Sequence, residues 1–303
     1  MELDELINGG WGRHETETEQ LALELLEGVE LVKDAGQAAA FSALASHTLG
    51  EHLGNWGGAA TLIEGALHGL DEAPELTSTV ILLGVAQEFA GDEEAAVASL
   101  ERARSLAGDD VLVRVRTHFA RASAHMGVGD SALLIQEHAK GMELVSTMPD
   151  TASVDRLVAI MSNNLASHLL GLEALSDEES KGMLEIALAA RAAWWRAGEW
   201  VQRERADYLM ALVHNRRANW EAGLKAADEA LATIATNGEE LIDEAFLQLA
   251  RAQALNGMQE LDGRDSALGV ADALASEWGE GLKAWYEEQR AKSLEAPRQS
   301  SSS

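Results

Sequence analysis

The hydrophobic positions of this chain recur at the spacing of an α-helix almost throughout. In QLALELLEGVELVKD, residues 20–34, the leucines and Val29 fall at steps of three and four residues, which places them in one stripe along a helix. Runs in which Val, Ile and Thr alternate with polar residues, the pattern of half-buried strands, are missing, and the helix-favouring residues Ala, Leu, Glu and Arg dominate. The pattern predicts an all-α protein.

Turn residues divide this helical pattern into pairs. Within LGVAQEFAGDEEAAVASLERARSL, residues 83–106, we expect one helix to end near Ala90 and Gly91 to break it. Asp92 can then cap the next helix, and the two glutamates that follow favour its first turn. The same order of helix, short turn and helix recurs at Gly54-Asn55-Trp56, Gly129-Asp130 and Ala218-Asn219-Trp220, and more loosely in residues 157–195 and 241–278.

Between residues 37 and 280 the paired units resemble the tetratricopeptide repeat family, whose helical hairpins repeat about every 34 residues. The residues that carry the resemblance are the Leu83-Gly84 pair, the Gly91-Asp92 turn, and the small residues Ala96 and Ala103 of the second helix. The resemblance implies a right-handed superhelical solenoid of about six antiparallel hairpins, each covering the apolar face of the next. The early turns are 37 or 38 residues apart, so the chain is identified as a divergent member.

The two ends of the chain differ from this pattern. Residues 1–19 are polar and weakly patterned, and we expect a loosely ordered lead-in to a helical-repeat domain over residues 20–290. Residues 291–303 contain a proline and a run of serines, which predicts a disordered tail.

Charge and composition narrow the classes of partner and compartment. The formal net charge is −28, which disfavours binding to nucleic acids and to anionic membranes. Solvated helix faces are the simplest reason for this acidity, and a salt-rich habitat or a basic partner stay open. The chain has no cysteine, no secretory signal in MELDELINGG and no apolar run long enough for a membrane span. We therefore expect a cytoplasmic protein.

Catalytic and cofactor motifs are missing from the sequence. There is no HExxH, no glycine-rich phosphate loop and no GxSxG elbow. In HTLGEH, His47 and Glu51 lie one helical turn apart, with His52 beside them, but two ligands from one turn fall short of a metal site. We predict hydrogen bonding there, no metal and no cofactor. An enzyme that uses His47, Glu51 and His52 is the least favoured function.

Three histidines occupy similar places, about four residues before a hairpin turn: His125, His168 and His214. A row of histidines can act as a pH sensor, because the charge of histidine changes near neutral pH. We favour packing between helices, and the sensor stays open as an alternative.

The resemblance also implies a binding surface, because first helices of successive hairpins line a concave groove in the family. Arginine binds carboxylates in a bidentate manner and asparagine can hold a peptide backbone, so we expect a peptide or protein partner, with an acidic segment or C-terminus as one form. The alternative is that the arginines pair with acidic residues of neighbouring helices. The expected groove residues are Arg116, Phe119, Ser123, Asn163, Arg205, Tyr208, Leu212, Asn215 and Arg216.

The most aromatic stretch is AAWWRAGEW, residues 192–200. Adjacent Trp194 and Trp195 point about 100° apart on a helix, so they cannot share one face with Trp200. An exposed tryptophan beside arginine would anchor an interface. Core packing is the simpler interpretation for any single one of the three.

From these observations we predict a non-catalytic adaptor that holds a peptide or protein in a concave helical groove. Long repeat surfaces with few preorganised pockets are typical of such proteins. A regulatory module that senses a peptide or small ligand is the alternative.

Overall fold

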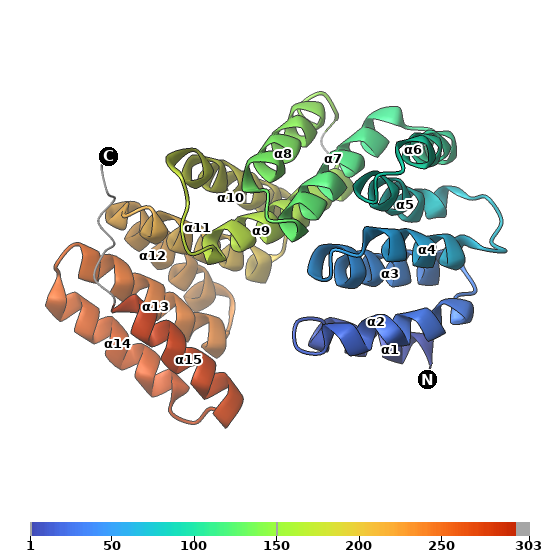
Figure 1. Ribbon diagram of the computed structural model, residues 1–303. Coiled ribbons are helices and arrows are strands. Elements are labelled where there is room, and N and C mark those ends of the chain that lie inside the picture. Colours follow the sequence, from blue (N-terminus) through green and yellow to red (C-terminus); the bar gives the residue numbers. More distant parts are fainter. Residues whose placement is uncertain (1, 150, 295–303) are drawn as a thin grey trace. The chain divides into compact units, whose positions relative to one another are not determined.

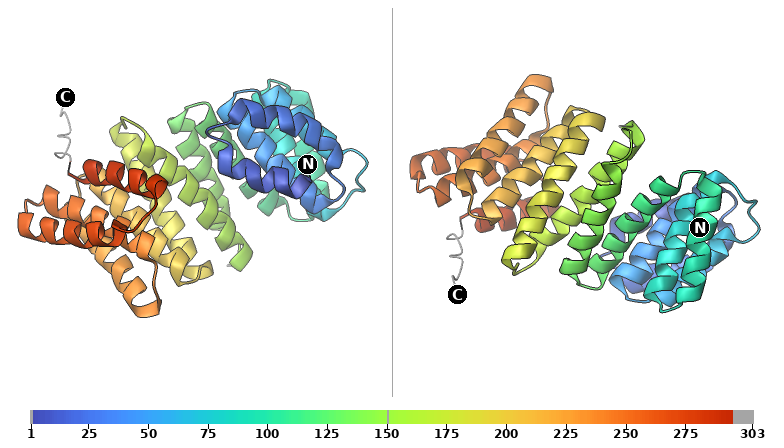
Figure 2. Two further views of the ribbon diagram at one scale, coloured as in Figure 1. Left: turned by 90° about the horizontal axis from the view of Figure 1, so that it is seen from below. Right: turned by 90° about the horizontal axis from the view of Figure 1, so that it is seen from above.

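The protein is all-helical in the part that the structure describes. The computed structural model describes residues 2–149 and 151–294, and all regular elements in these ranges are helices, which confirms that the protein is all-α. Contacts divide the chain into two compact units, Met1–Pro149 and Asp150–Ser303. In each unit, helices that follow one another in sequence pack side by side (Figure 1). Figure 2 shows these neighbouring helices from two further directions.

The first unit is built from eight α-helices and three shorter helical turns among its described residues. Two of the turns are 3₁₀ and one, η2, is a π-helix. The elements are α1 (Leu3–Arg13), α2 (Thr18–Gly28), η1 (Val29–Leu31), α3 (Ala35–Ala45), η2 (Ser46–His52), α4 (Trp56–Leu67), η3 (Pro74–Leu76), α5 (Thr77–Phe89), α6 (Glu93–Ala107), α7 (Asp110–Gly127) and α8 (Ser131–Val145).

The second unit continues the same pairing of helices. The pairs α9 with α10, α11 with α12, and α13 with α14 pack closely, and α15 packs on α13. The elements are α9 (Ala152–Gly171), α10 (Asp177–Ala197), α11 (Trp200–Arg216), α12 (Trp220–Asn237), α13 (Leu241–Gly257), α14 (Leu261–Ala275) and α15 (Glu280–Ser293).

Short polar side chains set where most second helices begin. Asp92 accepts a hydrogen bond from the backbone N–H of Ala95, and Asp130 accepts one from Leu133. These caps satisfy donors that the first turn of a helix leaves unpaired. Gly91 and Gly129 precede them with φ of 85° and 75°, a conformation that glycine adopts at little cost. The turn pattern in the sequence therefore predicted these boundaries for a local physical reason.

The expected lead-in over residues 1–19 is wrong. Helix α1 covers most of it, and Leu3, Leu6 and Ile7 are buried in the core of the first unit. These three residues form an apolar stripe of little more than one helical turn, and the rest of the region is mostly polar. The sequence of residues 1–19 therefore shows no extended hydrophobic pattern. At the other end, α15 extends to Ser293, beyond the expected limit of residue 290. The rest of the predicted tail, residues 295–303, lies outside the described residues.

His138 is a titratable group in the core of the α7–α8 pair. Its side chain is 4% exposed, and its ring centroid lies 5.6 Å from that of Phe119. Burial lowers the pKa of His138 to about 4, because the charged imidazolium loses its hydration.

This burial predicts a loss of stability in acid. Between pH 6.5 and 4 the unfolded chain binds a proton at His138 that the folded chain does not, so the free energy of unfolding falls as the pH falls, by about 3 kcal/mol. Urea unfolding of the wild type and His138→Leu at pH 7.5 and 4.5 measures this. The difference between the two pH values should shrink in the variant and stay unchanged in the exposed control His68→Gln. An equal difference in all three proteins would contradict the assignment.

Candidate functional site

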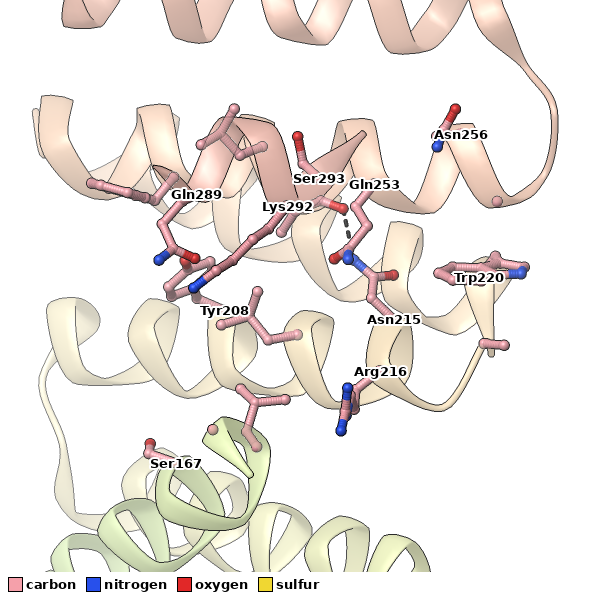
Figure 3. A pocket seen from close by; sticks show the side chains of 18 of the residues that line it. Ser167, Tyr208, Asn215, Arg216, Trp220, Gln253, Asn256, Gln289, Lys292 and Ser293 are labelled. Atoms are coloured by element: carbon pink, nitrogen blue, oxygen red, sulfur yellow. Dashed lines mark hydrogen bonds between the residues drawn. The ribbon is translucent and has the colours of Figure 1, made fainter. Parts of the chain in front are cut away.

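A cavity of about 490 Å³ lies in the second unit, where α9, α11, α13 and α15 meet (Figure 3). Its volume is in the range of small-ligand and peptide sites. Three aromatic residues, Tyr208, Trp220 and Phe246, contribute to its wall. The polar lining consists mainly of amides and hydroxyls: Ser167, Asn215, Gln253, Asn256, Gln289 and Ser293.

Asn215 fixes one wall of this cavity. It is 2% exposed, and its Nδ2 donates a hydrogen bond of 2.8 Å to the carbonyl oxygen of Ala250 on α13. Its side chain also lies directly against Gly223 of α12, where a Cβ atom would overlap with it. Asn215 therefore holds three helices together. One donor of its amide is therefore engaged inside the protein, and the expected contact of this side chain with a peptide backbone stays a prediction.

Arg216 lines the cavity and bonds to the two residues that follow α9. Its Nη2 donates to the carbonyl oxygens of Leu172 and Glu173, at 2.8 Å each. Carbonyls at the end of a helix lack partners within that helix, and the guanidinium supplies them here. Arg216 therefore connects the end of α9 to the end of α11.

The structure brings together four of the nine expected groove residues: Tyr208, Leu212, Asn215 and Arg216 line the cavity. Asn163 is half-buried on α9 and is not part of the lining. Arg205 is also outside the lining, and its Nε lies 2.8 Å from Asp243 Oδ2.

The other three expected residues belong to the first unit and have internal partners. Arg116 donates to Ser78 Oγ at 2.6 Å, and Ser123 donates to Glu51 Oε1 at 2.9 Å. Phe119 is 1% exposed. Its assignment to a groove surface is wrong, because its ring packs in the core against α8.

Many of the arginines pair with acidic side chains, as the alternative interpretation predicted. Most of these pairs join different helices, and several are partly buried. They include Arg102 with Glu72, Arg121 with Glu88, Arg191 with Asp207, Arg196 with Asp155, and Arg205 with Asp243.

A buried carboxyl lies one turn from Tyr208 on α11. Glu204 is 0% exposed, and burial, followed by the neighbouring carboxylate Asp243, raises its pKa to about 9. Burial, Asp243 and Glu204 likewise raise the pKa of Tyr208. Both groups are therefore neutral at pH 7, and Tyr208 presents a neutral phenol to the cavity.

Comparisons with known proteins do not indicate a function for this chain. No family model matches the chain, and no curated protein matches it. Among solved structures, the chain is similar to BtubC (BKLC) from P. vanneervenii, with 14% sequence identity and a TM-score of 0.43, over 92% of this chain and 94% of that one. A likeness this distant says nothing about activity. No helix in the described ranges has the length and apolar character needed to cross a bilayer.

The tryptophan segment presents one ring to solvent. Trp195 is 44% exposed, and the guanidinium carbons of Arg191 and Arg203 lie 5.4 and 5.7 Å from its ring centroid. Such cation–π contacts hold a ring in place. Trp194 and Trp200 are half-buried. Of the three expected anchors, Trp195 has the exposure that an interface residue needs.

The three expected histidines are half-buried between helices. The ring centroid of His125 lies 4.9 Å from that of Phe89. Burial lowers the pKa of His125 and of His214, which moves their protonation away from neutral pH. These observations favour the packing role, and a pH-sensing row stays a prediction.

Proposed function

We propose that this chain is a non-catalytic interaction protein whose second unit binds an extended peptide segment in the cavity between α9, α11, α13 and α15. The observation that carries the proposal is the amide lining of the cavity. Gln253 of α13 and Gln289 of α15 both project into it (Figure 3). Each amide offers two donors and one acceptor group, which is what the alternating N–H and C=O groups of an extended backbone require.

The other lining residues support a peptide over an ion. Tyr208, Leu212 and Phe246 give apolar surface against which side chains of a peptide can pack. Lys292 at the rim pairs with Glu288 at 2.7 Å, and Arg216 is engaged with carbonyl oxygens. We therefore assign recognition to the peptide backbone and its apolar side chains rather than to a terminal carboxylate.

The proposal extends to the fold around the cavity and to the compartment of the protein. Side-by-side packing of successive helices and capped short turns support a solenoid of the tetratricopeptide-repeat kind, in which first helices of successive hairpins form the binding surface. The chain has no cysteine, which is compatible with a reducing compartment such as the cytoplasm. We propose a cytoplasmic adaptor.

Peptide selection tests this function. A random peptide library displayed on phage is selected against the full chain, and the enriched peptides are synthesised for fluorescence anisotropy. The double variant Gln253→Ala/Gln289→Ala should bind them about tenfold more weakly or worse, because each lost hydrogen bond costs about 1 kcal/mol. Gln136→Ala, an exposed glutamine of the first unit, is the matched control and should bind as the wild type does. Failure to enrich any peptide, or equal affinity in the double variant, would contradict the proposal.

A further inference from the structure

Three histidine rings meet in the first unit, far from the cavity in sequence. His14 follows α1, while His47 and His52 lie in the π-helix η2. One ring nitrogen of each lies within 4.8 Å of those of the other two. The Nε2 atoms of His47 and His52 are 3.1 Å apart, and the His14 ring centroid lies 4.9 Å from that of His47 and 5.3 Å from that of His52.

The π-helix is the reason that His47 and His52 face each other. In an α-helix, residues five apart point about 140° away from each other. In η2 the backbone N–H of Leu53 bonds to the carbonyl of Thr48, five residues earlier, and this wider turn places residues i and i+5 one above the other. Single π-helical turns are frequent at functional sites.

Hydrogen bonds at the opposite ring nitrogens orient two of the rings. Nδ1 of His14 donates to the carbonyl oxygen of Trp11 at 2.8 Å, and Nδ1 of His47 donates to Glu51 Oε2 at 2.6 Å. A neutral imidazole whose Nδ1 carries the proton has its lone pair on Nε2. Ser123 of α7 in turn donates to Glu51 at 2.9 Å. Carboxylate and carbonyl partners of this kind orient histidines that ligate metals.

Two close packing contacts hold η2 in this conformation. The ring of Trp56 lies against Gly50, where an added Cβ would come within 2.6 Å of Cε3. On the other side, Gly127 of α7 lies against the backbone of Glu51, and an added Cβ would come within 2.8 Å of the Glu51 carbonyl oxygen. The histidine pair is therefore mounted on a segment fixed from two directions.

We propose that His14, His47 and His52 form a binding site for a divalent transition-metal ion, with Zn²⁺ as the preferred occupant. Three imidazole nitrogens would ligate the metal, and the fourth position of a tetrahedron would face water. Neutral imidazole suits zinc, copper and nickel, and the set contains no thiolate. In a tetrahedral zinc site, ligand nitrogens are about 3.3 Å apart, close to the separation of the His47 and His52 nitrogens.

The surroundings fit such an ion. His14 and His47 are half-buried and His52 is exposed, so a metal ion can enter from solvent. His14 belongs to the short connection between α1 and α2, which allows its ring to approach the other two.

Zinc titration tests the site. The full chain, prepared without a histidine tag and stripped with EDTA, is titrated with ZnCl₂ by isothermal titration calorimetry at pH 7.5. We expect one Zn²⁺ per chain, and a loss of affinity of more than 100-fold in each of His14→Gln, His47→Gln and His52→Gln. Glu51→Gln, which removes the negative charge of the carboxylate that orients His47, should weaken binding about 10- to 100-fold. His68→Gln changes an exposed histidine outside the cluster and should bind as the wild type does.

A second readout separates loss of ligands from loss of folding. Co²⁺ added to the stripped wild type should give the visible absorption of a tetrahedral complex, and circular dichroism in EDTA should show that the variants remain helical. Zinc should raise the melting temperature of the wild type and His68→Gln but not of His47→Gln. The proposal is overturned if the wild type binds no zinc at micromolar concentration, or if His14→Gln binds zinc as tightly as the wild type.

Discussion

Replacing Gly127 by alanine is expected to lower the free energy of unfolding by about 3 kcal/mol, the upper part of the usual range for overpacking. The added Cβ would lie 2.8 Å from the carbonyl oxygen of Glu51. Because this neighbour is backbone rather than the end of a flexible side chain, either α7 or η2 has to move. Urea unfolding followed by circular dichroism measures the effect.

Gly57→Ala is the matched control in the same unit. Gly57 lies in the first turn of α4, and nothing stands within 4 Å of an added Cβ. Alanine should leave stability unchanged there or raise it by about 0.5–1 kcal/mol, because glycine is the poorer helix former. If Gly127→Ala unfolded at the same urea concentration as Gly57→Ala, the described contact between α7 and η2 would be wrong.

Glu204→Gln is expected to stabilise the protein most strongly at alkaline pH. The pKa of Glu204 is raised from 4.5 to about 9, so between these values the folded chain holds a proton that the unfolded chain releases. The free energy of unfolding therefore falls as the pH rises from 4.5 to 9, and a loss of a few kcal/mol accumulates over this interval. Glutamine resembles the protonated acid and does not ionise, so the loss should disappear.

Unfolding of the wild type and Glu204→Gln at pH 5, 7 and 9 measures this prediction. The two proteins should differ little at pH 5 and most at pH 9. Glu277→Gln changes an exposed carboxylate between α14 and α15 and should follow the wild type. Parallel curves for Glu204→Gln and the wild type would show that Glu204 is ionised in the folded protein.

Local patterns in the sequence predicted much of the helical architecture. The turns at Gly91-Asp92 and Gly129-Asp130 were predictable because a left-handed glycine and an aspartate cap act within a few residues. The region of α1 was not, because its apolar stripe is short and its burial depends on α2 and α3. Polar composition alone therefore misled the prediction for residues 1–19.

The cavity was predicted only in part, for a reason of geometry. Tyr208, Leu212 and Arg216 were found because their spacing places them on one face of a first helix. Gln253 and Gln289 were missed, since their arrival at the same cavity depends on how α13 and α15 pack. The assignment of Phe119 to the groove was wrong because an error of one residue in aligning a helix rotates the expected position by about 100°.

The cluster of His14, His47 and His52 could be predicted from the sequence only in part. Hydrogen bonding by His47 and Glu51 was expected from the sequence, and the structure has these two side chains bonded to each other. The approach of His52 to His47 requires a π-helix, and His14 directly follows α1, a helix that the sequence pattern did not predict. Neither the register of η2 nor the packing of α1 can be inferred from local spacing.

Hydrogen–deuterium exchange with a selected peptide tests whether the cavity of the second unit binds a peptide. The full chain is compared with and without a saturating concentration of a peptide from the phage selection. We expect slower amide exchange in the second unit, at the end of α9, the C-terminal halves of α11 and α13, and α15, because these segments line the cavity. Protection confined to residues 2–149, or to the surface around Trp195, would contradict peptide binding in the cavity.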